Sequence, residues 1–320
     1  MSSSEDKGRR TGHLERTADE PRDADLHEVR LERIEQVNER VRLFRLSLLS
    51  GPVKFLPGQW LDTYIPGVPK AGGFTITSAP SASSSSSSSA EEEPPYFELA
   101  VQESPENEPA AWLWRPAGEI LGETLRVRVG GRFVFPPPPP PPPLVPPFSR
   151  LKKVVFVAGG VGVNPLVSML SYIADNNSSS NDGASISGQT PLVDEVVFLY
   201  ASKMPRSGEL SDVLFLDRIT RLFGEGKVKG RVKLFVTGTG AAASSLQGAG
   251  ETRVINGTRV EVQRRRFTAA EDVEDAVGDD GRDDPGTVVY VCGPRGMTDE
   301  LVERLKGFID PRRVLTEKWW

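Results

Sequence analysis

A glycine-rich segment in the second half of the chain has the residue types that hold a phosphate group. The apolar run 154–158 leads directly into Gly159, Gly160, Val161, Gly162, Val163, Asn164 and Pro165. Glycines allow a sharp turn and a close approach of the backbone to a ligand. Asn followed by Pro is typical of a helix start, where free N–H groups attract anions. The spacing is not the usual Gly-x-Gly-x-x-Gly pattern, so close packing of a strand on a helix explains the segment equally well.

A second loop follows the last long apolar strand. Its residues are Tyr290, Val291, Cys292, Gly293 and Pro294, with Met297 in the helix that comes next. The carboxyl ends of parallel strands meet at one edge of a sheet, so we expect this loop to lie beside the first one. Cys292 has two interpretations, which the residues alone leave open: a small buried hydrophobic side chain, or a thiol packed beside a nicotinamide ring.

The rarest residue types exclude several classes of site. The chain has one cysteine, and its two histidines, His13 and His27, lie in a charged N-terminal stretch. One cysteine excludes a disulfide framework, an iron–sulfur cluster held by thiolates and a cysteine-rich zinc site. A core without histidine excludes a Ser-His-Asp triad and a histidine-ligated haem. We therefore expect chemistry supplied by a bound organic cofactor and no metal site.

Charge and hydropathy narrow the partners. The net charge is −5. This charge gives no general reason to bind nucleic acid or an anionic membrane surface. No run of 18 apolar residues is present, so no membrane span is expected.

The first half of the chain has the period of antiparallel strands. Around 125–129, apolar and basic residues alternate, as in a strand that is buried on one face. Further strands are expected at 29–37, 41–49, 59–65 and 96–102, separated by Gly and Pro turns. Several short strands at this spacing predict a small antiparallel β-barrel over residues 29–135.

The second half alternates strands with helices. Near-continuous apolar runs at 154–158, 196–200, 232–236 and 288–292 are typical of parallel strands buried on both faces. Helical patterns follow each run, at 165–174, 209–222, 268–276 and 298–308. The alternation predicts a doubly wound α/β domain over residues 151–320.

Low-complexity segments lie outside these two domains. Residues 1–28 are polar with mixed charges, and we expect a disordered tail there, without a secretory or mitochondrial signal and hence cytoplasmic. A serine-rich insert is expected at 81–93, and a proline-rich linker at 136–150. The eight prolines at 136–143 suit a stiff spacer about 25 Å long, or a ligand for a proline-binding module.

A barrel followed by an α/β domain with these two loops resembles the ferredoxin–NADP reductase superfamily of flavoproteins. The resemblance covers residues 29–320 apart from the inserts. It implies that Gly159–Pro165 binds the pyridine nucleotide and that Cys292, Gly293, Pro294 and Met297 close over the nicotinamide. Within the superfamily, the stretches 72–78, 129–133 and 317–320 resemble the oxidoreductase NAD-binding domain-containing protein 1 group.

The resemblance also implies a flavin site on the barrel. The superfamily has an Arg-x-Tyr-Ser motif there, and this chain has Gly72, Gly73, Phe74 and Thr75 in its place. Phe74 would pack on the flavin ring, the Thr75 hydroxyl would face ring N5, and Ile76, Thr77 and Ser78 would complete the site. The missing Arg weakens the hold on the FAD diphosphate and makes FMN an alternative. The second diphosphate loop corresponds to 108–112, which has lost its glycine.

The resemblance predicts a reaction. Hydride would pass from NAD(P)H to the flavin, with Thr75 and Cys292 as the catalytic residues, and electrons would go on to an unidentified acceptor, such as a separate protein. Trp320 would cover the flavin face, or the terminal Trp pair would simply hold down the chain end. The group is associated with NAD. Ser202, Lys203 and Arg206 would suit the 2′-phosphate of NADP, or they form a solvated turn, which is the default interpretation. The group's association with mitochondria competes with a cytoplasmic location.

Two other functions fit the same residues. The missing Arg is also expected of a pseudoenzyme that binds the nucleotide but has lost the flavin. The proline run would suit an adaptor. A basic run at 264–266 is a solvated surface, or a contact for an acidic electron-transfer partner.

Overall fold

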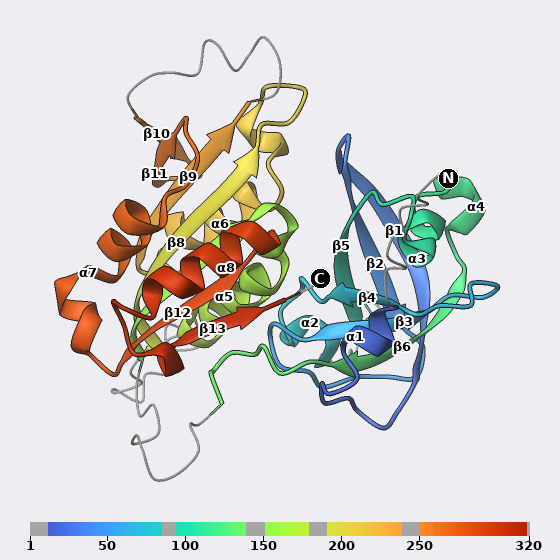
Figure 1. Cartoon of the computed structure of the whole chain (residues 1–320). Coiled ribbons are helices and arrows are strands. Elements are labelled where there is room, and N and C mark those ends of the chain that lie inside the picture. The colour runs from blue at the N-terminus through green and yellow to red at the C-terminus, as the bar shows by residue number, and fades with distance from the viewer. Residues whose placement is uncertain (1–11, 85–93, 139–150, 179–190, 239–249, 319–320) are drawn as a thin grey trace, which may run out of the picture.

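The computed structural model describes residues 12–84, 94–138, 151–178, 191–238 and 250–318. Two domains lie side by side (Figure 1), one built from the first half of the chain and the other from the second. In the described part of the chain, no helix has both the length and the apolar character needed to cross a bilayer.

The first domain is an antiparallel sheet of six strands, as expected. In chain order the strands are β1 (His27–Asn38), β2 (Val41–Leu48), β3 (Trp60–Tyr64), β4 (Gly72–Thr75), β5 (Tyr96–Gln102) and β6 (Thr124–Gly130). Their order across the sheet is β4-β3-β6-β1-β2-β5. The two edges approach each other where Ile76 bridges Leu99, and the Thr77 N–H donates to the Glu98 carbonyl over 2.8 Å. The sheet therefore rolls into a barrel, with α3 (Glu108–Leu113) and α4 (Ala117–Ile120) in the connection from β5 to β6.

The second domain has a mostly parallel sheet of seven strands in the order β10-β11-β9-β8-β7-β12-β13. The strands are β7 (Leu151–Gly159), β8 (Val193–Lys203), β9 (Gly230–Thr237), β10 (Glu251–Ile255), β11 (Thr258–Gln263), β12 (Thr287–Cys292) and β13 (Val314–Glu317). Only the β10–β11 pair is antiparallel. The α-helices are α5 (Val163–Ser178), α6 (Leu216–Gly224), α7 (Glu274–Asp283) and α8 (Arg295–Leu305).

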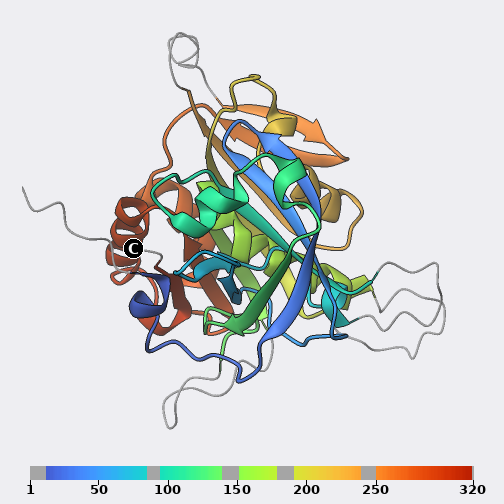
Figure 2. The same cartoon turned by 90° about the vertical axis from the view of Figure 1, so that its right-hand side faces the viewer.

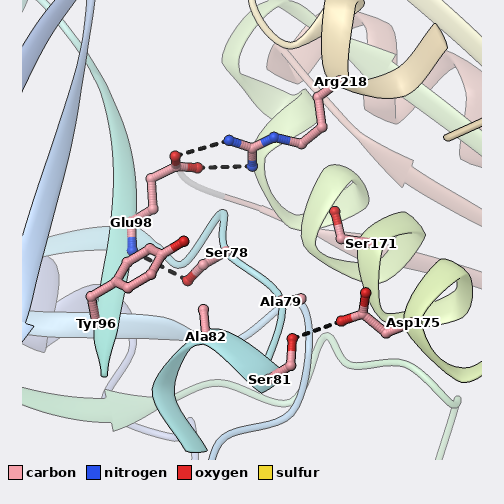
Figure 3. Close-up of a pocket in the computed structure, with 9 residues that line it drawn as sticks. All are labelled: Ser78, Ala79, Ser81, Ala82, Tyr96, Glu98, Ser171, Asp175 and Arg218. Atoms are coloured by element: carbon pink, nitrogen blue, oxygen red, sulfur yellow. Dashed lines mark hydrogen bonds and ion pairs between the residues drawn. The ribbon is translucent and has the colours of Figure 1, made fainter. Parts of the chain in front are cut away.

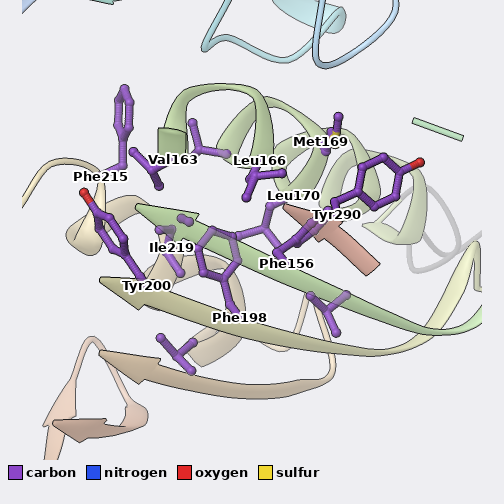
Figure 4. Close-up of a cluster of buried hydrophobic side chains, with 14 of the residues drawn as sticks. Phe156, Val163, Leu166, Met169, Leu170, Phe198, Tyr200, Phe215, Ile219 and Tyr290 are labelled. Carbon is purple, nitrogen blue, oxygen red and sulfur yellow. The ribbon is translucent and has the colours of Figure 1, made fainter. Parts of the chain in front are cut away.

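Alternate residues of the central strands face opposite layers. Phe156 and Phe198 pack with residues of α5 and α6 (Figure 4). Val155 and Val157 point the other way, into a cluster that includes residues of α7 and α8. Helices on both faces confirm the doubly wound arrangement predicted from the apolar runs.

Two expected helices start later than predicted. The segment 209–222 contains a short 3₁₀ turn at Leu210–Asp212 and then α6, which begins at Leu216. Phe215 between them has a left-handed φ of 59°, which interrupts the helix. The segment 268–276 begins as a π-helical turn, Ala269–Val273, before α7.

The predicted disordered tail is wrong for residues 12–28. These residues include α1 (His13–Arg16) and the start of β1, and they pack against the barrel. Buried ion pairs, described below, supply the stabilisation that their polar sequence does not suggest. Residues 1–11 lie outside the described residues.

The other low-complexity predictions are only partly described. Ser81–Ser84 form the short helix α2 rather than part of a loop, and the buried Ser83 hydroxyl anchors this helix by donating to the Val53 carbonyl over 2.7 Å. Residues 85–93 of the insert and 139–150 of the linker lie outside the described residues.

Candidate functional site

The two loops singled out in the sequence lie together at the carboxyl edge of the parallel sheet. β7 and β12 are neighbours, with Ala158 opposite Cys292. The sheet order reverses here, because β8 and β9 continue on one side of β7 while β12 lies on the other. In open α/β sheets, ligands bind in the crevice at such a reversal.

Glycine is required where the loops touch. A Cβ atom on Gly162 would lie 2.2 Å from the Cys292 carbonyl oxygen, and one on Gly159 would lie 2.8 Å from the Met297 sulfur. Gly160 differs, because it has a positive φ of 54° and open space where its Cβ would be. The tip of the loop at Gly160 is therefore open to a ligand, while its base is packed against the second loop.

Asn164 is not the helix cap that the sequence predicted. A 3₁₀ turn at Gly160–Gly162 runs straight into α5, so Asn164 falls inside the helix, with the buried Val163 and Pro165 on either side. Its side-chain N–H donates to the Ala100 carbonyl of β5 over 2.9 Å. Its Oδ1 atom is buried and has no hydrogen-bond partner among the described residues. This free acceptor lies where the two domains meet.

Cys292 is fully buried at the end of β12, and Glu317 of β13 lies opposite it in register. The Glu317 Oε2 atom is shielded from solvent and has no hydrogen-bond partner within the described ranges. Burial raises the pKa of Glu317 well above its usual value, and the nearby Glu20 raises it further. Burial and the nearby acid therefore both favour the protonated form of the Glu317 carboxyl, which lies beside the thiol. Sequence reasoning missed Glu317, although an acid at the end of a terminal strand was a signal for it.

On the barrel side, the end of β4 lies at the contact between the two domains, where the barrel meets α5; this contact is called the seam below. Thr75 is 5% exposed, and its hydroxyl makes no hydrogen bond with other described residues. Ile76 and Thr77 are fully buried. The carbonyl of Ser78 accepts a hydrogen bond of 2.7 Å from the Ser168 hydroxyl of α5. The structure thus brings the segment that follows Thr75 to the helix that follows the glycine loop.

One predicted flavin contact, Phe74, does not line this seam, and a second, Trp320, is not tested. Phe74 packs in the apolar core of the barrel and is 9% exposed, so its ring does not stand open for a flavin to stack on. The reason is strand alternation, because Phe74 pairs with Leu61 on the inner face of the sheet. Trp320 lies outside the described residues.

The N-terminal strap, residues 12–23, covers the outer face of β3, β4 and β6. Its anchor is Asp62 of β3, whose side chain is inaccessible to solvent. His13 Nε2 lies 2.9 Å from one carboxylate oxygen of Asp62, and Arg22 Nε donates to the other over 2.9 Å. Arg128 of β6 donates to that second oxygen over 2.8 Å. Burial raises the pKa of Asp62, but hydrogen bonds from these three side chains outweigh it and leave the pKa lowered.

The expectation that the folded core lacks histidine is wrong, because the strap places His13 inside the fold. His13 is 6% exposed and lies edge-on to the Trp60 ring, with the ring centres 4.7 Å apart. It fills the space beside Gly73, where a Cβ atom would lie 2.1 Å from the imidazole. Gly73 and Thr75 share one face of β4, so the strap borders the predicted flavin site. The signal in the sequence was Asp62 itself, an acid within an apolar strand that requires cationic partners.

The strap also reaches the second domain. Figures 1 and 2 place α1 near the end of β13. Glu20 forms an ion pair of 3.0 Å with Arg132, and it is close enough to Glu317 to raise the pKa of that carboxyl. One segment therefore connects the outer face of the barrel with the strand beside Cys292.

The residues present fit a nicotinamide nucleotide. The open tip at Gly160, the start of the 16-residue helix α5 and the free Asn164 acceptor lie along one sheet edge. Backbone N–H groups at a helix start suit a diphosphate, and a free acceptor suits an amide N–H.

The fit to FAD is incomplete. Thr75 offers a free hydroxyl, but no side chain fits at Gly72, where a Cβ atom would lie 2.7 Å from Pro109. At the start of α3, Asn107 already accepts the N–H of Ala110, and Glu108 adds a negative charge that Lys70 pairs with over 2.8 Å. The loop assigned to the second diphosphate by resemblance therefore has one N–H already capped and an acidic side chain at its start, neither of which favours an anion.

A polar cavity of about 430 Å³ lies along the seam (Figure 3). It is lined from the barrel side by Ser78, Ala79, Ser81, Ala82, Tyr96 and Glu98, and from α5 and α6 by Ser171, Asp175 and Arg218. Two pairs bridge the domains across it: Ser81 donates to Asp175, and Arg218 pairs with Glu98.

The basic run at 264–266 is largely used within the domain. Arg264 pairs with Glu251 over 2.9 Å, and Arg265 pairs with the buried Asp272 over 2.7 Å. These two side chains hold the edge of the sheet together, which favours the structural interpretation of the run.

Comparison with known proteins identifies the family. The chain is 31% identical over 313 residues to oxidoreductase NAD-binding domain-containing protein 1 of Bos taurus, covering 98% of this chain and 86% of that protein. It is 30% identical to the Danio rerio protein of the same name, covering 98% of each. The chain belongs to the oxidoreductase NAD-binding domain-containing protein 1 family. No protein-family model matches the chain.

Solved structures agree with the fold of this family member. A ferredoxin NADP⁺ reductase from Neisseria gonorrhoeae with bound FAD and NADP covers 93% of the chain and 100% of its own, with a TM-score of 0.58 and 14% identity. The CS-b5R domains of human Ncb5or, in the NAD⁺ form, cover 92% of this chain and 70% of their own, with a TM-score of 0.58 and 16% identity. At these identities the likeness shows the two-domain fold alone.

Proposed function

We propose that this chain is an NAD(P)H-dependent flavin oxidoreductase. The observation that supports it best is the contact of the two loops at the reversal of the sheet, at Gly162 and Cys292, beside the seam with the barrel. A bound flavin would accept hydride from the nicotinamide and pass electrons to a separate acceptor. The curated relatives share the name of NAD-binding oxidoreductases, and a solved relative of the fold holds FAD and NADP.

The proposed role of the protein is to bind the nucleotide and the flavin, to orient their rings and to exclude water from between them. The backbone at Gly160 and the start of α5 would hold the nucleotide diphosphate. Cys292, Gly293, Pro294 and Met297 would form the wall beside the nicotinamide. Thr75 would direct its hydroxyl at the flavin ring. Because hydride transfer requires two rings near 3–3.5 Å apart, the rigid contacts across the seam matter more than any acid or base.

We propose NAD rather than NADP as the substrate. The loop after β8 would face the adenosine ribose, and the Glu39 carboxylate from the barrel accepts the Arg206 N–H there over 3.4 Å. A carboxylate near this ribose suits a 2′-hydroxyl and repels a 2′-phosphate. Titration with NADH and NADPH in parallel tests this preference.

A second candidate is a nucleotide-binding protein that has lost the flavin. Two observations favour this candidate over the flavin oxidoreductase: Gly72 lies against Pro109, and an acid, Glu108, stands at the start of α3. Calorimetry with FAD, FMN and NADH separates the two candidates. Binding of a flavin supports the oxidoreductase, whereas binding of NADH alone supports the second candidate.

A further inference from the structure

One cross-domain contact reaches the barrel two residues beyond Thr75. Arg218 of α6 in the nucleotide domain places its guanidinium against the Glu98 carboxylate of β5, with N–O distances of 2.8 and 2.9 Å. The same guanidinium donates to the Thr77 carbonyl over 3.3 Å. Figure 3 shows the paired geometry at the edge of the polar cavity. A forked contact of this kind fixes direction as well as distance.

Glu98 transmits this contact to the segment after β4. Its carboxylate accepts the Thr77 hydroxyl over 2.7 Å, its carbonyl accepts the Thr77 N–H, and its own N–H donates to the Ser78 hydroxyl. Thr77 is fully buried, so its own N–H and hydroxyl are shielded from water, while the Glu98 side chain is 17% exposed at the cavity. The segment directly after Thr75 is therefore held by β5 on one side and by Arg218 on the other.

Arg218 is itself held in place by an unusual backbone. Phe215 has a φ of 59°, in the left-handed region that bulky residues avoid. This conformation puts the Phe215 ring beneath the guanidinium, 4.6 Å from the ring centre to the guanidinium carbon. Backbone strain of this type persists only where surrounding contacts enforce it, and it gathers at functional positions.

The rest of this edge of the seam is not tightly packed. The 430 Å³ cavity separates α5 and α6 from the barrel here, so the bridging pairs carry the contact. Elsewhere the domains share an apolar core, in which Phe133 of the barrel meets Tyr290 of β12 with ring centres 5.5 Å apart. Loss of the Arg218 contact therefore allows the two domains to move relative to each other at the cavity, while the apolar contact around Phe133 and Tyr290 still holds them together.

We propose that Arg218 is a positioning residue: through Glu98 and Thr77 it sets where Thr75 lies relative to the nicotinamide loops. The proposal rests on the proposed oxidoreductase function. It does not place Arg218 in contact with either cofactor. Its loss changes the alignment of the two rings, so turnover falls while nucleotide binding at the Gly160 loop is kept.

The test compares Arg218→Met, Arg218→Lys and Glu98→Gln with Arg221→Met. Arg221 lies on the same helix and pairs with Asp217 at the surface, both side chains being 58% exposed, so it is a matched control for charge. Turnover with NADH is measured on flavin-reconstituted protein. We expect kcat to fall roughly 10- to 100-fold in Arg218→Met, with KM for NADH changed less than about two-fold. Arg218→Lys keeps the positive charge but loses the two-pronged hydrogen bonding of the guanidinium, so its kcat is expected to lie between those of wild type and Arg218→Met.

A second readout needs no flavin. Spin labels at Arg33→Cys in the barrel and Val254→Cys in the nucleotide domain occupy exposed positions, whereas the native Cys292 is buried. The distance distribution between the labels broadens in Arg218→Met and Glu98→Gln and is unchanged in Arg221→Met. Unchanged distances, or an unchanged kcat in Arg218→Met, overturn the positioning role. Wild-type protein that shows no turnover refutes the oxidoreductase function instead, and the distances still decide whether Arg218 holds the domains.

Discussion

Replacing Asp62 by Ala tests the N-terminal strap. The substitution removes a fully buried carboxylate and leaves three donors, of His13, Arg22 and Arg128, without their acceptor. Breaking a buried ion pair from one side costs about 3–5 kcal/mol. Arg22 and Arg128 keep side-chain exposures of 14% and 27%, so water can solvate part of their charge. We therefore expect a loss of about 3 kcal/mol in the free energy of unfolding, at the lower end of that range.

The assay is thermal unfolding at pH 7 together with limited trypsin digestion. At about 2.1 cal/mol/K of unfolding entropy per residue, about 3 kcal/mol corresponds to a melting temperature lower by roughly 4–5 °C for this chain. Trypsin is expected to cut at Arg16 and Arg22 faster in the variant. Glu119→Ala is the control, because it breaks an exposed pair with Arg115 and should change stability by less than about 0.5 kcal/mol.

The stability difference between wild type and Asp62→Ala should also depend on pH. The folded-state pKa of Asp62 is lowered, so its stabilisation is present above the unfolded value near 4 and disappears as pH falls through the folded value. The difference between wild type and Asp62→Ala must therefore narrow below about pH 4. A variant as stable as Glu119→Ala at pH 7, with the strap no more open to trypsin, would refute the reasoning.

Three further substitutions test the site. Gly162→Ala places a methyl group 2.2 Å from the Cys292 carbonyl oxygen, so the loops must separate, and we expect NADH affinity by calorimetry to fall at least about ten-fold. Tyr290→Phe leaves the buried Val134 carbonyl without its 2.9 Å donor, and should lower the unfolding free energy by about 1–3 kcal/mol in denaturant titration. Burial raises the pKa of Glu317, so the stability of wild type relative to Glu317→Gln should fall as pH rises above about 4.5 in the same melting series.

Much of the fold was predictable because its signals are local. Alternation at 125–129 and the apolar runs of the second domain predicted strands that the structure contains. Strand-end reasoning predicted that the loops after β7 and β12 meet, because parallel topology brings them to one edge. Each of these inferences needs only neighbouring residues and a general rule of sheet geometry.

The missed features depend on contacts between distant residues. His13 and Asp62 are 49 positions apart, so the polar sequence of residues 12–28 gave no sign that buried ion pairs hold the strap. Asn164 looked like a helix cap, but its partner is the Ala100 carbonyl in the other domain. Phe74 was assigned to the flavin by motif, whereas its pairing with Leu61 turns it into the barrel core. Tertiary contacts override local preference in all three cases.

Anaerobic titration of the flavin-reconstituted chain with NADH measures the central claim most directly. The protein is incubated with FAD and with FMN, freed of unbound flavin, and followed through the flavin absorbance band. We predict that a flavin is retained and that its absorbance bleaches with NADH, more readily than with NADPH. A protein that stays colourless after reconstitution, or one whose bound flavin keeps its absorbance at saturating NADH, would contradict the account.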